Sequence, residues 1–518
     1  MLLVVGQELL TYLWQIYVPP KVVNWRFMSC RHSALTSFRE QERRRVVLVT
    51  GATGFIGRVL LYKLLTACPD IAKVILLLRP RGTESCADRL ANLLSAPVST
   101  FLMFGSKEPP IIPLHHELAN IPRDKVTYIA GDLTEPGLGI GAEDLRRLLS
   151  SQVSVAFHIA ASVKFDDPLR KALETNFFSA LALALVIVST AFAFFPRKEV
   201  GEEVYSVPVN LKGVQDIASL DLQHLEKIRK EGHWVNTYTF SKALLENAVQ
   251  QNNTLLRIAI VRPSIVLNAW KEPLPGWINN ISGPLRILRG LFLGHVRAIL
   301  FDGRKTADIV PVDLCVNSLI AVAKETAEHG ERGGCKVYNF ISGTRNRIAW
   351  REYWSQCSKQ IHRFPALHAQ WYNFYVRTKF WTLYYVMWFC LELIPACIVH
   401  LTSPKHRRKI GQTLGSLRYM QLVGHFATNE CKFEDANTRS LLAKLSPHDR
   451  TIFNFDILQV DWAEYLADCV KGMRLHILKE GSSTLPSARN RHKRLFALHC
   501  TVMMGALYVG YKAMSSAL

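Results

Sequence analysis

The chain has 518 residues, of which 49% are hydrophobic and 20% are charged, and this composition excludes a largely disordered protein. Its length exceeds that of one ordinary hydrophobic core, so we expect more than one folded unit. The 63 Lys and Arg against 42 Asp and Glu give a net charge of +21. This charge suits nucleic acid, an anionic membrane surface or an acidic ligand, and equally an unselected basic surface.

The cysteines and the N-terminus give mainly negative predictions. The eleven cysteines form no CxxC pair and no metal-ligand spacing, so we interpret them as buried thiols in a reducing compartment and predict no disulfide and no metal site. The apolar segment Met1–Val18 lacks a basic start and a small-residue cleavage site. We therefore predict an N-terminal extension at residues 1–45 and no secretory signal.

The first strong signal begins at Val46. The run Val46–Thr50 has the composition of a buried parallel strand, the sequence GATGFIG follows at Gly51–Gly57, and a helical pattern covers Arg58–Leu65. This order of strand, glycine turn and helix predicts a dinucleotide-binding site. A glycine-rich loop without a ligand is the minor alternative.

Each glycine of this turn has an expected role. Gly51 permits the tight turn, Gly54 lets the backbone approach a pyrophosphate, and Gly57 lets the helix pack on the strand. The N-terminus of the helix faces the phosphate charge.

The second expected strand, Lys73–Leu78, ends at Arg79-Pro-Arg81. An Asp or Glu at this place would bind the 2′-hydroxyl of NAD, whereas two cations suit the 2′-phosphate of NADPH. We therefore predict NADPH, and we favour Arg79 over Arg81 because Arg79 directly follows the strand.

Two further strands are expected. Val126–Ala130 precedes Gly-Asp-Leu, which places the carboxylate of Asp132 beside the adenine edge. Val155–Ala161 ends in two alanines where the nicotinamide ribose would pass. We interpret His158 as a packed strand residue and not as a proton carrier.

The second strong signal is the pair Tyr238 and Lys242. On a helix these positions share a face, so we expect the ammonium to lie near the phenol and to lower its pKa, which makes Tyr238 a usable general acid at neutral pH. The same YxxxK spacing also occurs at Tyr17, Tyr375 and Tyr508, so the spacing alone does not identify a catalytic pair.

Context separates these four pairs. Pro19 and Pro20 prevent the first from being helical, and the last two lie far beyond the nucleotide-binding sheet. Only Tyr238 lies between two expected sheet strands, Leu183–Val188 and Arg257–Val261.

The strand before Tyr238 ends at Ser189-Thr190-Ala191. A hydroxyl at this place would hydrogen-bond to a substrate carbonyl oxygen and share its developing negative charge with Tyr238. We favour Thr190 for this role, with Ser189 as the alternative.

In chain order, the motifs of residues 46–345 read VTGATGFIG, GDL, FHIAASVKFD, STA, YTFSK, IVRPSIV and PGWINN…ADIVPVDLCVN. In this combination they resemble the catalytic half of the fatty acyl-CoA reductases. The remainder resembles the C-terminal male sterility domain of that family, at Lys432–Asn437, Phe453–Asp456, Val460–Trp462 and Gly472–His476. The resemblance implies an α/β fold with a Rossmann-type doubly wound parallel sheet at 46–345, a mainly α-helical domain at 346–488, and a basic flank with a hydrophobic tail at 489–518.

The resemblance also implies the reaction, which is the NADPH-dependent reduction of a long-chain fatty acyl-CoA to a primary alcohol and CoA in two hydride transfers. Tyr238 would protonate oxygen, Lys242 would tune Tyr238 and hold the nicotinamide ribose, and Thr190 would steady the oxyanion. Acyl selectivity would come from Pro275–Asn280, the apolar helix near Leu288–Leu293 and the sterility domain. The predicted cofactor contacts are Gly51, Thr53, Gly54, Phe55, Ile56, Gly57, Arg79, Arg81, Asp132, Leu133, Ala160, Ala161, Tyr238, Lys242 and Pro263.

One segment departs from the family pattern. Only twelve residues separate Asn176 from Ser189, where the family usually has a long amphipathic helix. About twenty residues remain between the two flanking strands, which still meets the minimum for a parallel crossover. We expect a short crossover helix, and the placement of Thr190 depends on it.

Two segments point to an intracellular membrane. Phe380–Leu401 is apolar apart from Glu392 and contains Pro395, and it fits a buried or re-entrant helix and a membrane span equally well. The tail Leu495–Leu518 follows four basic residues, which favours a C-terminal anchor with the bulk of the protein in the cytosol. The family resemblance implies an intracellular membrane, of the endoplasmic reticulum or peroxisome, with the catalytic domain facing the cytosol. An amphipathic surface helix is the alternative.

Three other functions compete with this one. A sterol dehydrogenase or nucleotide-sugar epimerase would share Tyr238 and Lys242 but would not explain the sterility-domain motifs. A non-catalytic NADPH-binding membrane protein is motivated by the short crossover. A nucleic-acid binder lacks any recognisable module, so no nucleic-acid partner is predicted, and no oligomeric state is predicted.

Overall fold

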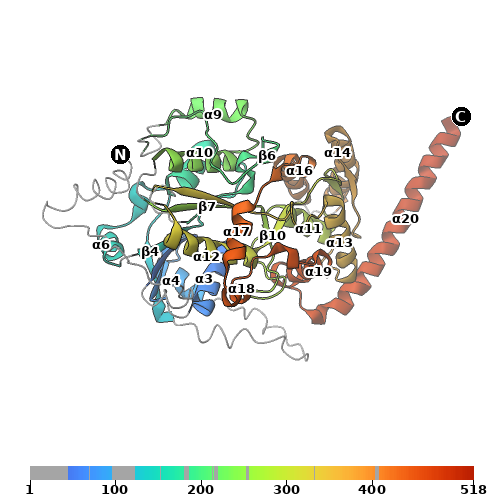
Figure 1. Cartoon of the computed structure of the whole chain (residues 1–518). Coiled ribbons are helices and arrows are strands. Elements are labelled where there is room, and N and C mark those ends of the chain that lie inside the picture. The colour runs from blue at the N-terminus through green and yellow to red at the C-terminus, as the bar shows by residue number, and fades with distance from the viewer. Residues whose placement is uncertain are drawn as a thin grey trace.

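The structure is a computed structural model that describes residues 45–68, 71–95, 123–151, 153–179, 186–212, 214, 220–252, 256–331, 333–402 and 408–517. Within these ranges, seven strands form one parallel sheet in the order β11-β7-β5-β4-β1-β2-β3 (Figure 1). The chain order reverses between β1 and β4, which is the doubly wound arrangement that was predicted. The strands are β1 (Val46–Thr50), β2 (Lys73–Leu78), β3 (Val126–Ala130), β4 (Val153–His158), β5 (Val186–Val188), β7 (Ile258–Pro263) and β11 (Cys335–Phe340).

Two strands, β4 and β7, begin and end at other residues than predicted. β4 ends at His158, three residues before Ala161, because the chain turns here and the Ala160 amide donates to the Thr50 side chain over 3.4 Å. β7 continues to Pro263. The predicted start of β5 at Leu183 lies outside the described residues.

Helices cover both faces of the sheet. Val47 and Val49 belong to one apolar core, whereas Leu48 between them points to the opposite face. Helix α3 packs against α12 on the first face, and α10 packs against the crossover helix on the other. These helices are α3 (Phe55–Ala67), α4 (Cys86–Ser95), α6 (Ala142–Ser150), α9 (Leu222–Glu231), α10 (Thr237–Asn252) and α12 (Val312–His329).

The crossover between β4 and β5 is short, as predicted. Its described helical part consists of α7 (Leu169–Leu173) and the π-helical turn η4 (Glu174–Phe178). Asn176 in this turn is fully buried and donates to the Ser162 carbonyl and the Ser241 hydroxyl, each over 3.1 Å. The crossover is therefore tied to α10 despite its length.

The C-terminal part is mainly helical. Its elements are α13 (Trp350–Arg363), α14 (Trp381–Trp388), η7 (Phe389–Leu393), α15 (Ile394–Thr402), α16 (Arg408–Thr428), α17 (Ala436–Lys444), α18 (Pro447–Ile452), α19 (Trp462–Gly472), η10 (Met473–Ile477) and α20 (Leu485–Ala517). Short parallel pairs join it to the rest of the chain: β9 (Ala298–Leu300) with β12 (Val376–Thr378), and β6 (Glu199–Val200) with β13 (Lys432–Phe433). Helix α11 (Pro284–Phe292) and the parallel pair of β8 (Ile265–Leu267) with β10 (Ile309–Pro311) precede it in the chain.

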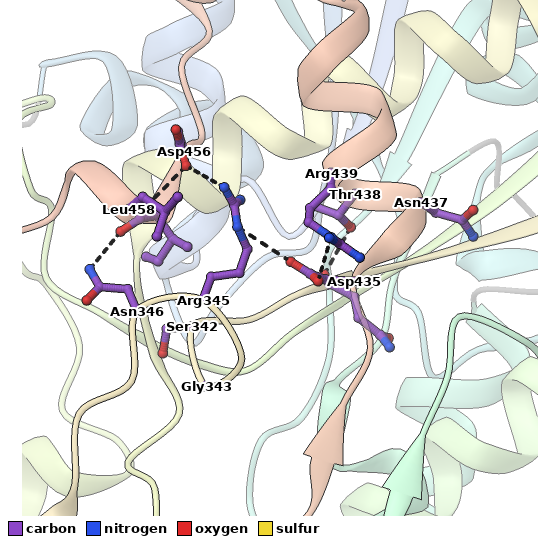
Figure 2. Close-up of polar contacts among 12 residues, drawn as sticks. Ser342, Gly343, Arg345, Asn346, Asp435, Asn437, Thr438, Arg439, Asp456 and Leu458 are labelled. Carbon is purple, nitrogen blue, oxygen red and sulfur yellow. Dashed lines mark hydrogen bonds and ion pairs between the residues drawn. The ribbon is translucent and has the colours of Figure 1, made fainter.

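Arg345, in the loop after β11, joins two of the sterility-domain motifs. Figure 2 shows its guanidinium between Asp456, at 2.9 Å, and Asp435, at 4.0 Å. The neighbouring Asn346 amide donates to the carbonyls of Ile457 and Val460 over 2.9 and 2.8 Å. These motif residues therefore hold the C-terminal helices onto the edge of the sheet.

Two glycines make a backbone-to-backbone contact between the two halves of the chain. Gly276 has φ +75°, and a Cβ on it would collide with the backbone of Asp468 in α19. A Cβ on Gly472 would in turn collide with the backbone of Gly276. The loop that contains Gly276 therefore lies directly against the end of α19.

The elements α14, η7 and α15 form one continuous helix, which we call the apolar helix (Trp381–Leu401). Among the described residues it alone is long and apolar enough to cross a membrane. Every fourth residue, Tyr384, Trp388, Glu392 and Ala396, is buried against the body of the protein. The remaining face is exposed and apolar, with Phe380, Leu383, Val386, Phe389, Ile398 and Leu401 all more than 45% accessible. The apolar helix is therefore docked by one side and bare on the other.

Helix α20 projects from the body and ends in the solvent (Figure 1). Its first turns pack on residues 371–374, where Tyr372 lies 4.9 Å from the Phe496 ring and Phe374 lies 4.6 Å from the His499 ring. From Thr501 to Lys512 every residue is exposed. The anchor predicted for this tail stays a prediction.

Candidate active site

The glycine turn after β1 tolerates no side chain at two of its three glycines. Gly51 has φ +76°, and a Cβ on it would lie 2.6 Å from the Ala160 amide nitrogen. A Cβ on Gly57 would collide with the Gly51 carbonyl oxygen. Gly54 is exposed at the N-terminus of α3, where free amides face outward. The turn thus has the close packing and the open helix end that bind a pyrophosphate.

Two arginines that sequence reasoning missed contact this turn. Arg58 donates to the Thr53 carbonyl over 3.1 Å, and Arg89 donates to the Thr53 hydroxyl over 3.1 Å. Arg89 also donates to the carbonyl of Arg79. Burial and the charge of Arg89 lower the pKa of Arg58, which shows how closely the cations approach one another. Arg58 directly follows the GATGFIG motif in the chain. Arg89 comes from α4, a helix that was not predicted from the sequence.

The predicted residues Arg79 and Asp132 lie together. The Arg79 guanidinium donates to Asp132 over 3.4 Å, and its side chain is 60% exposed. Asp132 also accepts from the amide and hydroxyl of Thr134 over 3.0 and 2.8 Å. Burial raises the pKa of Asp132, but these hydrogen bonds and the Arg79 charge outweigh it and leave the pKa below its usual value. Arg81 is exposed, and Leu133 is half-buried.

His158 is a packed strand residue, as predicted. Its ring nitrogens lie 3.0 Å from the Thr50 hydroxyl and 3.3 Å from the Ser179 hydroxyl. Burial, helped by the charge of Lys242, lowers its pKa to about 3. Ala160 and Ala161 follow as half-buried residues beside the glycine turn.

Tyr238 and Thr190 meet above the end of β5. Helix α10 begins after Asn236, whose side chain accepts from the Thr239 amide over 2.9 Å and caps the helix. This start places the Tyr238 hydroxyl close to the Thr190 side chain, which acts to lower the pKa of Tyr238. The short crossover therefore still brings the strand end to Tyr238.

Lys242 is buried one turn further along α10. Its ammonium donates to the Val188 carbonyl over 2.8 Å. Burial lowers the pKa of Lys242 to about 8, against the opposing charge of Glu246. Burial raises the pKa of Tyr238 to about 12, and the nearby Thr190 side chain opposes this. The predicted lowering of the Tyr238 pKa by Lys242 is therefore not found, and the Lys242 ammonium is directed to the Val188 carbonyl.

Ser189 has a different partner from Thr190. Its hydroxyl donates to Glu246, a fully buried carboxylate paired with the fully buried Arg262. Arg262 Nε lies 3.0 Å from both oxygens of Glu246. Ser189 therefore belongs to a buried ion-pair network, and Thr190 alone of the two contacts Tyr238.

Aromatic rings that sequence reasoning missed lie beside Tyr238. The Phe165 ring lies 5.8 Å from the Tyr238 ring, and on its other side 6.1 Å from Phe426 of α16. Phe192, two residues after Thr190, lies 5.5 Å from Phe426. No local pattern signals this contact, because Phe426 is almost 200 residues from Tyr238 in the chain.

The other predicted residues have these places. Pro263 is the buried last residue of β7. The Trp277 ring of the loop Pro275–Asn280 stacks on Phe55 of the glycine turn at 5.7 Å. Tyr375 precedes a strand, and Tyr508 lies on the exposed part of α20, so neither competing YxxxK pair adjoins the sheet.

Two family models match the chain, and both carry the description "Male sterility protein". They cover residues 49–319, which is just over half of the chain, and residues 391–480. Fatty acyl-CoA reductase 2 of Homo sapiens is 33% identical over 474 residues, with 88% of each chain covered. The chain belongs to the fatty acyl-CoA reductase family. Fatty acyl-CoA reductase 1 of Xenopus laevis, at 33% identity over 89% of this chain and 90% of its own, and fatty acyl-CoA reductase wat of Drosophila melanogaster, at 31% over 88% and 89%, agree.

Solved structures show the same fold. The terminal R domain of the myxalamid PKS-NRPS pathway matches with a TM-score of 0.54 at 18% identity, covering 84% of this chain and 91% of its own. The reductase domain of a nonribosomal peptide synthetase from Mycobacterium tuberculosis matches with 0.52 at 20% identity, covering 83% and 91%. The solved structures confirm the Rossmann-type fold. The family models and the relatives confirm the family resemblance and a nicotinamide-dependent oxidoreductase. The sterol and nucleotide-sugar alternatives are therefore set aside.

Proposed function

We propose that this reductase converts a long-chain fatty acyl-CoA to a primary alcohol and CoA, and that it consumes two NADPH. The proposal rests on the position of Tyr238 on α10, where its hydroxyl lies close to Thr190 and Lys242 is buried one turn further along. NADPH, when bound, supplies the hydride for each reduction. The first reduction breaks the carbon–sulfur bond and gives aldehyde and CoA thiol, and the second gives the alcohol, with one proton taken up in each.

The protein's own groups act on the substrate oxygen. With a pKa near 12, Tyr238 is protonated at neutral pH, so it can donate a proton to the oxygen as negative charge develops there. Thr190 supports the same oxygen by a second hydrogen bond. Lys242, one turn from Tyr238, holds a positive charge beneath the site and is the candidate for the nicotinamide ribose contact.

The preference for NADPH rests on the arginines near the glycine turn. Arg58 and Arg89 both bind Thr53, and Arg79 lies at the end of β2, where the adenosine ribose is bound in this fold. No carboxylate takes the place of Arg79 at this strand end, and a 2′-phosphate would be paired with guanidinium groups.

A membrane location forms part of the proposal. The bare face of the apolar helix and the exposed tail of α20 both present apolar side chains, and Arg489, Arg491, Lys493 and Arg494 precede the tail. Glu392 accepts from the backbone amides of Arg297 and Ala298 over 2.8 and 3.0 Å, contacts that a spanning helix would lose. We therefore propose that the apolar helix lies in the plane of an intracellular membrane, that α20 anchors the protein, and that the catalytic residues 46–345 face the cytosol.

The test uses the purified full-length protein with palmitoyl-CoA and NADPH, and alcohol is followed by gas chromatography. We expect hexadecanol, about two NADPH consumed per alcohol, and a lower rate with NADH. Tyr238→Phe should abolish turnover and retain NADPH binding. Tyr375→Phe, a half-buried tyrosine of another YxxxK pair, is the matched control and should keep activity. Intact NADPH binding without any alcohol would instead identify a non-catalytic NADPH-binding protein.

A further inference from the structure

Helix α16 joins the active site to the apolar helix. It has 21 residues and is therefore roughly 30 Å long. Phe426, near its C-terminal end, faces the catalytic residues, whereas Ser416 donates to Glu392 of the apolar helix over 3.0 Å. One element thus contacts both the reacting centre and the helix whose other face is bare.

The active-site end of α16 is surrounded by hydrocarbon rings. Phe426 lies 5.0 Å from Phe195, 5.5 Å from Phe192 and 6.1 Å from Phe165. Phe165 contacts both Phe426 and Tyr238 and so links the two rings. A carbonyl group held by Tyr238 and Thr190 therefore places the carbons next to it among phenylalanine rings.

These rings suit a methylene chain better than a polar group. Each methylene that leaves water for such surroundings gains about 0.8 kcal/mol. The neighbouring His425 packs edge-on against Phe195 at 5.7 Å, and burial lowers its pKa, so it adds no charge at neutral pH. No carboxylate or ammonium appears among the described ring contacts of Phe426.

Gly424 shows how the two ends connect. A Cβ on Gly424 would lie 2.9 Å from the Trp381 ring and 2.8 Å from the Leu300 side chain. Trp381, the first residue of the apolar helix, is therefore in contact with α16 two residues from Phe426. Apolar side chains follow one another from Tyr238 to the bare face without an intervening ionised group on these contacts.

We propose that α16 is the acyl-binding element: Phe426 contacts the acyl chain beside the reacting carbon, and the chain runs along α16 toward Trp381 and the lipid side. This inference rests on the proposed function and assigns the substrate wall to a C-terminal helix. It narrows the expectation that Pro275–Asn280, the helix near Leu288–Leu293 and the sterility domain set acyl selectivity to one helix of that domain, α16. Trp277 of the loop Pro275–Asn280 is stacked on Phe55 of the glycine turn.

A kinetic test separates chain binding from chemistry. Phe426→Ala should raise KM about tenfold for palmitoyl-CoA and for shorter acyl-CoAs alike, because every acyl chain passes Phe426 beside the reacting carbon. NADPH affinity should not change. Phe364→Ala is the matched control, because Phe364 is another half-buried phenylalanine but contacts Arg363 and Lys471 instead. An unchanged KM for palmitoyl-CoA in a folded Phe426→Ala protein would overturn the proposal.

A second test needs no turnover. Two palmitoyl-CoA probes carry a photoreactive diazirine, one near the carboxyl end and one at the methyl end, and labelled peptides are identified by mass spectrometry. We expect the first to label peptides with Phe165 or Phe426, and the second to label α16 or Trp381. Labelling of Pro275–Asn280 by the second probe, with α16 unlabelled, would overturn the inference. If both probes label the expected peptides but no alcohol is produced, the proposed reaction is wrong while the acyl-binding role of α16 is supported.

Discussion

The Tyr238 hydroxyl lies beside the Thr190 side chain, although Ser189 is the neighbouring hydroxyl in the chain. Both residues reach α10, but at different levels: Thr190 lies at Tyr238, and Ser189 donates to Glu246 about two turns further along the helix. Ser189 thereby enters the network of Glu246 and Arg262. Substitutions at these two adjacent positions should therefore fail in different ways.

Thr190→Val removes the hydroxyl that lies near Tyr238 and keeps the shape of the side chain. Because one donor to the developing oxyanion is lost, kcat should fall by about 10²- to 10³-fold with NADPH affinity unchanged. Ser189→Ala should keep most of kcat but lower the free energy of unfolding by about 1 kcal/mol, since Glu246 loses a donor. Steady-state kinetics and urea unfolding of both variants check this, and equal kinetic losses would contradict it.

The pH dependence should report Lys242 rather than Tyr238. Lys242 has its pKa lowered to about 8 and Tyr238 has its pKa raised to about 12. If the reaction requires the ammonium, kcat/KM measured at low NADPH should be flat below about pH 8 and fall about tenfold per unit above it. Lys242→Met should be slower and should lack this break. A break that appears only near the pKa of Tyr238 would contradict the role of Lys242.

His158 should make the fold sensitive to acid. Its pKa is about 3 in the folded protein and about 6.5 when unfolded, so between these values the unfolded chain binds the extra proton and stability falls as the pH falls. The expected loss from pH 7 to pH 5 is about 2 kcal/mol. His158→Gln should lose this part of the slope in urea unfolding at the two pH values, and a slope equal to wild type would argue against it.

Arg89 should contribute to cofactor choice. Arg89→Ala removes a guanidinium that binds Thr53 beside the glycine turn, so the ratio of kcat/KM for NADPH to that for NADH should fall at least about tenfold. Arg146→Ala is the control, because Arg146 is an exposed arginine on α6 that pairs only with Glu143 among the described residues. Equal losses with NADPH and NADH would indicate a structural effect.

Cys390 can report how the apolar helix meets a bilayer. It is an exposed thiol near the middle of that helix, unlike the buried thiols expected from the sequence. An environment-sensitive fluorophore on Cys390 should shift to the blue with anionic vesicles and be quenched more by bromines near the lipid headgroups than by deep ones. Stronger quenching by deep bromines would mean that the helix spans the bilayer. A label on Leu458→Cys in a Cys390→Ser background, which occupies an exposed position near α19, should not respond.

The sequence predicted what is local and missed what is brought together by folding. The strand, turn and helix around Gly51 are adjacent in the chain, and so are Tyr238 and Lys242 on one helix. The pKa of Tyr238 was wrong because it depends on burial and on where the Lys242 ammonium finds an acceptor, and Val188 is 54 residues away. Phe426 and Arg89 were missed for the same reason, since each reaches its partner only through tertiary structure.

Gly276 and Gly472 touch backbone to backbone across the two halves of the chain, so neither can be replaced separately by any other residue. Chimaeras that exchange the C-terminal halves of related reductases should therefore fold only when the incoming half brings a glycine at the second position. Recombined reductases must therefore keep glycine at both positions. Only then could an exchange of α16 transfer the acyl-chain preference from one enzyme to another.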